Sequence, residues 1–224
     1  MNVIICEGKN DACFLNEIMK ERFNLRMHTI YYHELEKLQE MLGTNCYNFV
    51  KTKYPLIIYG DGGKANIIIA LRRIVVETLG KNNDELYIIL IRDDDGAPYE
   101  VLNTNLCIEL QSLLRDRSKF IVHIPNIECN DDFFILTHPR SRGILKIKLK
   151  TVPSNLEKQI AKKTMEFKGL TDSKILEQLD NDPHKALELL ANKYYSGDEN
   201  RLIRESSILL KDETWVNEIN RLVN

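Results

Sequence analysis

The chain has 224 residues, of which 43% are hydrophobic and 29% charged, and its formal net charge at pH 7 is −2. This composition is typical of a globular protein with a hydrophobic core, built as one large domain or as a domain of ordinary size with an appendage. No apolar run approaches the length of roughly 20 residues that a membrane-spanning helix needs. The chain begins with a predicted strand, so we expect no signal peptide. We therefore expect a cytoplasmic protein with no membrane partner.

The first half of the chain alternates apolar strands with amphipathic helices. Strands are predicted at 2–6, 55–59, 86–92 and 119–124. Helices are predicted at 10–22, 33–42, 64–79 and 98–114, with a further candidate strand at 28–32. Continuous apolar strands are typical of parallel sheets that are covered on both faces. Because short connections join the strands through helices, we predict an α/β fold with a mostly parallel four-stranded sheet flanked by helices.

The pattern changes after Pro125. Short strands are predicted at 133–136 and 144–149, and the second of these alternates apolar and basic residues. Alternation places Lys146, Lys148 and Lys150 on one face of a strand.

The remainder of the chain is predicted to be helical. Ser154 to Glu157 has the pattern of a capping box, Asp182-Pro183 that of a capped helix start, and a last helix is predicted at 198–223. We divide the chain into an α/β domain, 1–136, and a second part, 137–224. The second part holds a basic β-hairpin or linker and a small helical subdomain that packs on the sheet.

Positive charge is concentrated in the second part. Residues 1–138 carry a net charge of −5 and residues 139–224 a net charge of +3. The basic stretch consists of Arg140, Arg142, Lys146, Lys148, Lys150, Lys158, Lys162 and Lys163. Such a stretch attracts polyanions, so we take the first five as candidate nucleic-acid contacts. The alternative is a solvated face without a partner.

The five cysteines are odd in number and show no CxxC spacing. This pattern predicts neither a set of disulfides nor a zinc ribbon. We expect buried thiols in a reducing compartment.

Two acidic segments each follow a predicted strand. The first contains Glu7, Gly8 and Asp11, and the second contains Asp93 and Asp95. The carboxyl ends of parallel strands meet at one edge of the sheet, so these acids are expected to converge there. In an extended chain Asp93 and Asp95 face the same way, and clustered carboxylates suit Mg²⁺ or Mn²⁺. The alternatives are a simple turn, a helix cap and a polar loop.

The pattern Glu7-Gly8-x-x-Asp11 after one strand, with Asp93-x-Asp95 after a later one, resembles the Toprim domain of topoisomerases, bacterial primases and several nucleases. The resemblance covers roughly residues 1–130. It implies a Toprim-like, Rossmann-like sheet in which Glu7 is a general acid or base or a metal ligand. By the same resemblance Asp93 and Asp95 would hold Mg²⁺.

A second motif, Gly60-Asp61-Gly62-Gly63-Lys64, resembles the glycine-lysine turn of the overcoming-lysogenization-defect nucleases and related stand-alone Toprim proteins. Backbone amides in such a turn can approach a phosphate, and Lys64 could neutralise it. Nuclease-type members also carry an acid after the fourth strand, a position that Glu128 matches.

Three residues depart from the Toprim pattern. Asp94 makes a run of three aspartates, which leaves open which two face inward, and Gly96 follows Asp95 more closely than is common in the family. Arg92 could pair with one of the acids and reduce the demand for metal.

The chain is too short for the gate and tyrosine domain of a topoisomerase, and it lacks the zinc module of a replicative primase and a Walker A sequence. We therefore predict a compact nuclease-type Toprim protein that uses Mg²⁺ or Mn²⁺ on DNA or RNA. The alternatives are a Toprim-like nucleic-acid-binding module and a small-molecule phosphatase or nucleotide-binding regulator. The sequence does not separate DNA from RNA, endo from exo cleavage, or monomer from homodimer.

Overall fold

A computed structural model describes residues 2–23, 27–30, 56–60, 62–79, 85–115, 126–129, 133–139 and 141–223. The strands are β1 (Asn2–Cys6), β2 (Met27–Ile30), β3 (Leu56–Gly60), β4 (Glu85–Asp93), β5 (Asn126–Cys129), β6 (Phe134–Thr137) and β7 (Ile144–Val152). The helices are α1 (Lys9–Phe23), α4 (Lys64–Thr78), α5 (Tyr99–Arg115), α6 (Leu156–Lys168), α7 (Ser173–Asn181), α8 (Pro183–Tyr194), α9 (Glu199–Leu210) and α10 (Thr214–Val223).

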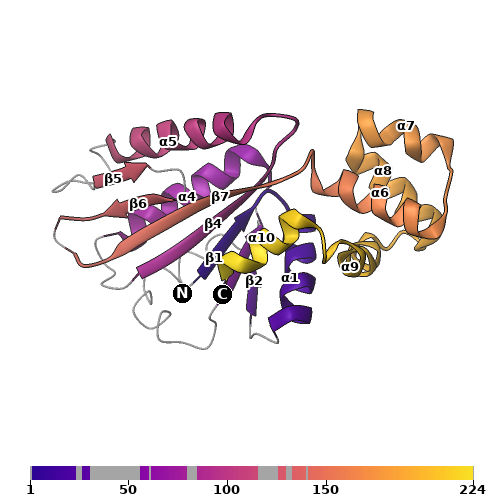
Figure 1. Cartoon of the computed structure of the whole chain (residues 1–224), viewed down its shortest axis with the longest axis horizontal. Coiled ribbons are helices and arrows are strands. Elements are labelled where there is room, and N and C mark those ends of the chain that lie inside the picture. The colour runs from indigo at the N-terminus through magenta and orange to yellow at the C-terminus, as the bar shows by residue number, and fades with distance from the viewer. Residues whose placement is uncertain are drawn as a thin grey trace.

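The predicted α/β class is confirmed, and the strands form one mixed sheet in the order β2-β3-β1-β4-β7-β6-β5 (Figure 1). The strands β2, β3, β1, β4 and β7 run parallel, whereas β6 pairs antiparallel with both β7 and β5. The middle one of the five parallel strands is β1, which pairs with β3 on one side and β4 on the other. All five carboxyl ends of the parallel strands therefore lie at the same edge.

Helices cover both faces of the sheet. The helices α1 and α10 lie on one face, and α4 and α5 lie on the other (Figure 1). Successive residues of β1 serve the two cores: Ile4 is buried with α1, and Ile5 is buried with α4 and α5. This two-sided burial explains why β1 and β3 are apolar without alternation.

The prediction of a four-stranded sheet is wrong, since the sheet has seven strands in the described part of the chain. The principal difference is β7, which pairs with β4 from Glu85↔Ile144 to Asp93↔Val152. Its residues Leu145, Ile147 and Leu149 are buried against the α4–α5 face. The predicted strand 119–124 and helix 33–42 lie outside the described residues, and the boundary between 136 and 137 stays a prediction.

The helices α6, α7 and α8 lie beyond the carboxyl ends of the parallel strands (Figure 1). Asp182 caps α8 and Pro183 begins it, as predicted. The capping-box prediction for α6 is wrong, because Asn155 is the N-cap and its side chain accepts a hydrogen bond from Lys158 N. Ser154 has a φ of 60°, which is left-handed, whereas a capping residue has extended backbone.

The single helix predicted at 198–223 is two helices, α9 and α10. The chain turns between them, so that α9 packs on α1 and α6 while α10 returns to the sheet. Trp215 of α10 stacks on Phe14 of α1, with ring centroids 5.6 Å apart. A straight helix of this length, roughly 39 Å, would leave the sheet face uncovered.

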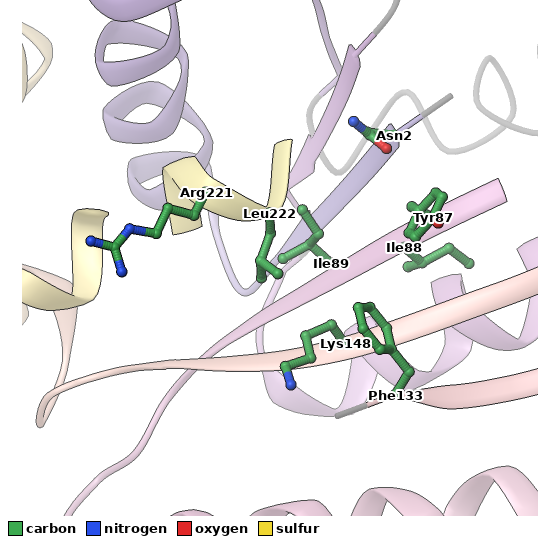
Figure 2. A pocket seen from close by; sticks show the side chains of 8 residues that line it. All are labelled: Asn2, Tyr87, Ile88, Ile89, Phe133, Lys148, Arg221 and Leu222. Carbon is green, nitrogen blue, oxygen red and sulfur yellow. The ribbon is translucent and has the colours of Figure 1, made fainter. Parts of the chain in front are cut away.

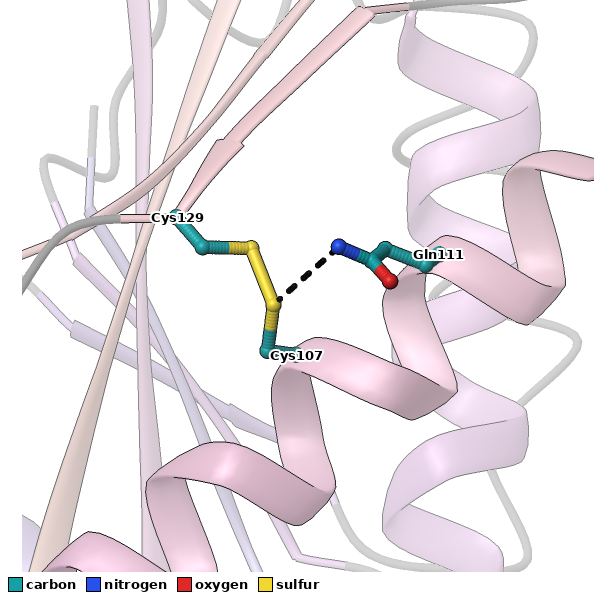
Figure 3. Close-up of a disulfide and its surroundings, with 3 residues drawn as sticks. All are labelled: Cys107, Gln111 and Cys129. Carbon is teal, nitrogen blue, oxygen red and sulfur yellow. Dashed lines mark hydrogen bonds between the residues drawn. A yellow bond between two sulfur atoms is a disulfide. The ribbon is translucent and has the colours of Figure 1, made fainter.

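Cys107 of α5 and Cys129 of β5 form a disulfide, so the expectation that no disulfide forms is wrong (Figure 3). The amide of Gln111 donates a hydrogen bond of 3.5 Å to the Cys107 sulfur. Cys6 and Cys13 are buried thiols, as expected, and Cys46 lies outside the described residues. Disulfides such as Cys107–Cys129 are typical of proteins in oxidising environments, so the cytoplasmic location stays a prediction.

Across the ranges given above, no helix combines the length and the apolar character needed to cross a membrane.

Candidate functional site

The carboxylate of Glu7 lies across the end of β4. Glu7 and Gly8 form the turn between β1 and α1, and Glu7 Oε1 accepts a hydrogen bond of 3.1 Å from Asp93 N. The first acidic segment therefore reaches the second directly, at the carboxyl edge of the parallel strands. This contact places Glu7 and Asp93 on the same edge.

Asp11 lies beneath this contact and is buried. Its Oδ2 accepts a hydrogen bond of 2.8 Å from Gly8 N, which fixes the carboxylate against the turn. Burial raises the pKa of Asp11 well above its ordinary value, and the nearby carboxylates of Asp93, Glu157 and Glu7 raise this pKa further. These three carboxylates are thus close enough to Asp11 to disfavour its charged form, and a cation would relieve that repulsion.

The three consecutive aspartates have three different environments. Asp93 Oδ1 accepts a hydrogen bond of 3.1 Å from Leu156 N, in the first turn of α6. Asp94 Oδ1 accepts bonds of 2.8 Å from Ser154 N and from Gly96 N.

Asp95 is exposed in a turn past the end of β4, with a φ of 47°. The strand ends at Asp93, so the alternation that would align Asp93 with Asp95 does not extend to Asp95. The structure therefore brings Asp93, and not Asp95, to the contact with Glu7.

Glu157 is a site residue that the sequence interpretation missed. It is buried in the first turn of α6. Its Oε1 accepts a hydrogen bond of 3.2 Å from Asn10 Nδ2 and lies 3.3 Å from His184 Nδ1. The sequence pattern assigned Glu157 to a local capping box, and nothing in the spacing links it to His184. Tertiary packing of α6 and α8 over the strand ends creates the pair.

The two members of this pair shift each other's titration. Burial would raise the pKa of Glu157, but the hydrogen bond and the positive charge of His184, together with hydrogen bonds from the backbone and from Asn10, lower that pKa. The Glu157 carboxylate in turn raises the pKa of His184 to about 9. At neutral pH His184 is therefore a cation that neutralises one of the four acids.

Arg92 supplies a second positive charge. Its Nε lies 3.9 Å from Glu7 Oε1, and both side chains are largely buried. This is the pairing anticipated for Arg92. The site therefore contains four carboxylates, with one guanidinium and one imidazolium beside them.

The glycine turn after β3 lies against the turn that carries Glu7. Gly63 N donates a hydrogen bond of 2.8 Å to the carbonyl of Glu7. Gly60 packs so closely on Gly8 that an added Cβ would lie 2.5 Å from the Gly8 carbonyl oxygen. Lys64 begins α4 at the same edge; its side chain and Asp61 lie outside the described parts.

Glu128 does not join these acids. It lies in β5, which is three strands from β4, or roughly 14 Å across the sheet. Its neighbours across the strands are Ile135, Lys146 and then Tyr87. Tyr87 precedes Asp93 by roughly 20 Å along β4, so Glu128 lies far from the carboxyl edge.

The basic stretch lies partly on the sheet and partly on α6. Lys146, Lys148 and Lys150 share the face that α10 covers, in register with Tyr87, Ile89 and Ile91. Several of its lysines have acidic partners: Lys146 with Glu85, Lys150 with Glu218, Lys158 with Asp180 and Lys163 with Glu213. Arg142 and Lys162 are exposed, while Arg140 falls outside the described residues. Much of the positive charge is thus neutralised within the chain.

The donor set of the acidic site fits a hard divalent ion, because Glu7, Asp11 and Asp93 offer only oxygen ligands. Among the described residues, however, no three His, Cys, Asp or Glu side chains are already arranged around one ion position. Glu7 and Asp93 each accept a backbone hydrogen bond instead. Binding an ion would require these side chains to rotate.

No family model matches the chain, and comparison with curated proteins and with solved structures finds no significant match. The resemblance to Toprim domains therefore depends on the motif residues and on their positions at the strand ends.

Proposed function

We propose that the chain is a Toprim-like, metal-dependent phosphodiesterase that cleaves nucleic acid with Mg²⁺ or Mn²⁺. The observation that carries this proposal is the contact between the Glu7 carboxylate and the backbone of Asp93, with Asp11 buried beside them. A protein that only bound nucleic acid would gain nothing from acids near a phosphate backbone. A cation bound by these acids would replace their repulsion of the phosphate with attraction.

Each residue of the edge has a role in this proposal. Glu7, Asp11 and Asp93 would hold the ion, which would polarise a phosphoryl oxygen and lower the pKa of a bound water. By resemblance to the stand-alone Toprim proteins, the glycine turn after β3 would let the backbone approach a phosphate, and Lys64 would neutralise that phosphate. By resemblance to Toprim nucleases, Glu7 would also serve as general acid or base.

The second candidate function is a nucleic-acid-binding module without catalysis. The observation that favours it is the structural use of several acids: Asp93 and Asp94 accept backbone hydrogen bonds that join β4 to the start of α6. Glu157 likewise has His184 as a partner. Acids that stabilise the fold in this way have a role in the protein even without a metal.

A cleavage assay with matched variants separates the two functions. Labelled single- and double-stranded DNA and RNA are incubated with the protein in Mg²⁺, in Mn²⁺ or in EDTA. Asp93→Asn removes a ligand charge, yet the asparagine Oδ1 can still accept the bond from Leu156 N. The control is Asp212→Asn, the same chemical change at an exposed residue between α9 and α10.

We expect cleavage that requires metal and that falls by about 100-fold or more in Asp93→Asn, because several kcal/mol of charge stabilisation are lost and each ~1.4 kcal/mol is tenfold in rate. The control should cleave as the wild type does. Binding without cleavage in either metal would support the binding module instead. Neither binding nor cleavage would refute both nucleic-acid functions.

A further inference from the structure

Glu157 and His184 join two helices at the carboxyl edge of the parallel strands. Glu157 lies in the first turn of α6, and His184 lies in the first turn of α8. The side chain of Glu157 is only 5% exposed, whereas that of His184 is 77% exposed. A buried carboxylate therefore holds an imidazole ring that remains open to solvent.

Short contacts link this pair to the acids of the edge. The residue before Glu157 donates its backbone amide hydrogen to Asp93 Oδ1. The Glu157 carboxylate accepts a hydrogen bond from Asn10, which is the neighbour of Asp11 in the chain. The Asp93 carboxylate also raises the pKa of His184, as a charge does only from nearby. The imidazole thus belongs to the surroundings of the acidic edge.

The two nitrogens of the His184 ring have different surroundings. Nδ1 lies 3.3 Å from Glu157 Oε1 and is directed to that carboxylate. Nε2 is directed away from Glu157 and is the nitrogen that a ligand can reach. In the protonated ring both nitrogens carry a hydrogen. A carboxylate that fixes one nitrogen of an imidazole in this way orients the other nitrogen for proton transfer.

The charged groups that act on His184 come from three elements. The acids that raise its pKa to about 9 are Glu157 of α6, Asp182 at the start of α8 and Asp93 of β4, and desolvation opposes them. Other charged groups near α8 act elsewhere: Lys158 of α6 pairs with Asp180 of α7, and Arg201 and Glu205 of α9 act on Tyr195 at the far end of α8. His184 is therefore a proton donor at neutral pH.

We propose that His184 donates a proton to the leaving oxygen of the phosphodiester and that Glu157 positions it, an inference that rests on the nuclease function proposed for the acidic edge. The oxygen of a water forms a bond to phosphorus, and the bond between phosphorus and the leaving oxygen breaks. The leaving oxygen takes the proton of His184 Nε2, and the water gives its proton to the Glu7 carboxylate. Proton exchange with solvent then restores both side chains.

Two other protonated groups of the described chain are less suited to this step. Arg92 lies beside Glu7, but a guanidinium does not give up its proton in proteins. Tyr87 lines a pocket of about 340 Å³ on the α10 side of the sheet (Figure 2). It precedes Asp93 by six residues on β4, or roughly 20 Å, so its hydroxyl is too far from the acids.

A change of leaving group tests the proton transfer. The ends of the cleavage products show whether the 3′ or the 5′ oxygen leaves, and a second substrate carries sulfur in place of that oxygen. Because a thiol is far more acidic than an alcohol, a thiolate leaves without a proton. The kcat of both substrates is measured for the wild type, for His184→Gln and for Lys185→Gln. Lys185→Gln is the control, since it removes the charge of an exposed neighbour in the same turn.

We expect His184→Gln to lower kcat at least about 100-fold on the oxygen substrate and no more than about threefold on the sulfur substrate. Lys185→Gln should match the wild type on both. An equal loss on the two substrates, or no loss on the oxygen substrate, would overturn the proton donor while leaving the nuclease function intact. A wild type that cleaves neither substrate with either ion would refute the nuclease function and the proton donor with it.

The pH dependence of kcat tests the role of Glu157. The wild-type kcat should fall as pH rises through about 9, because the donor loses its proton there. Glu157→Gln keeps an acceptor for His184 Nδ1 and removes the charge, so the fall should move towards the ordinary histidine pKa of about 6.5. His184→Gln should lack this fall. Circular dichroism checks that each variant is folded at the assay temperature. A fall at the same pH in Glu157→Gln as in the wild type would overturn the proposal.

Discussion

The substitution Gly60→Ala should displace the turn that carries Glu7 at the acidic edge. Gly60 ends β3, and a Cβ there would lie 2.5 Å from the Gly8 carbonyl oxygen and 2.9 Å from the Ala12 Cβ. Both distances are shorter than real contacts of a Cβ atom. The alanine methyl therefore forces the Glu7–Gly8 turn and the first turn of α1 to move away from β3.

The size of the effect follows from two opposing contributions. Overpacking of a close contact costs about 1–3 kcal/mol. Replacing glycine by alanine returns about 0.4–1 kcal/mol, because the unfolded chain loses freedom. We expect a net loss of about 1–2 kcal/mol in the free energy of unfolding. In a protein of this size that loss lowers Tm by roughly 2–8 °C.

Thermal and urea denaturation followed by circular dichroism measure the loss. The cleavage assay provides a second readout: Gly60→Ala should lose activity even at temperatures where it is fully folded, because the displaced turn carries Glu7. A Tm equal to or above that of the wild type would show that β3 and the Glu7–Gly8 turn do not pack as described.

Three further predictions concern titration and the disulfide. The contribution of the His184–Glu157 pair to the free energy of unfolding should be fully present between about pH 5 and 6.5 and be lost as pH rises through about 9. In urea denaturation, His184→Gln should therefore be less stable than the wild type at pH 6 but equally stable at pH 9.5. Asp11→Asn should raise the free energy of unfolding at pH 7 in EDTA and have less effect at pH 4. The reason is that the pKa of the buried Asp11 is raised, so the folded wild type becomes less stable as pH rises. Equal effects of the substitution at both pH values would contradict this. Cys107→Ser should lower the free energy of unfolding by about 3 kcal/mol through loss of the link to Cys129, and dithiothreitol should destabilise the wild type by a similar amount but not the variant.

The central part of the fold could be predicted because local sequence determines it. The strands β1, β3 and β4 contain apolar runs whose central residues are buried, as is typical of parallel strands covered on both faces. The turn at Gly8 and the shared edge of parallel strands were enough to bring Glu7 towards Asp93. Burial and connection length therefore specified this part of the site.

Other features depend on contacts that the local sequence does not encode. The alternating pattern of β7 shows that it is a half-buried strand, but not that β4 is its neighbour. The disulfide requires β5 to lie beside α5, which the spacing of Cys107 and Cys129 does not reveal. Glu157 joins the acids only because α6 begins at the carboxyl edge of the sheet.

Binding of Mn²⁺ to the acidic edge tests the account most directly. Electron paramagnetic resonance of free Mn²⁺ measures binding without requiring a substrate. Glu7→Gln removes one ligand charge and keeps an acceptor for Asp93 N, and Asp212→Asn is the control. We predict one saturable site in the wild type and in the control, and a loss of at least about tenfold in affinity in Glu7→Gln. Equal binding of Mn²⁺ by wild type and Glu7→Gln, or binding by neither, would contradict a metal site at this edge.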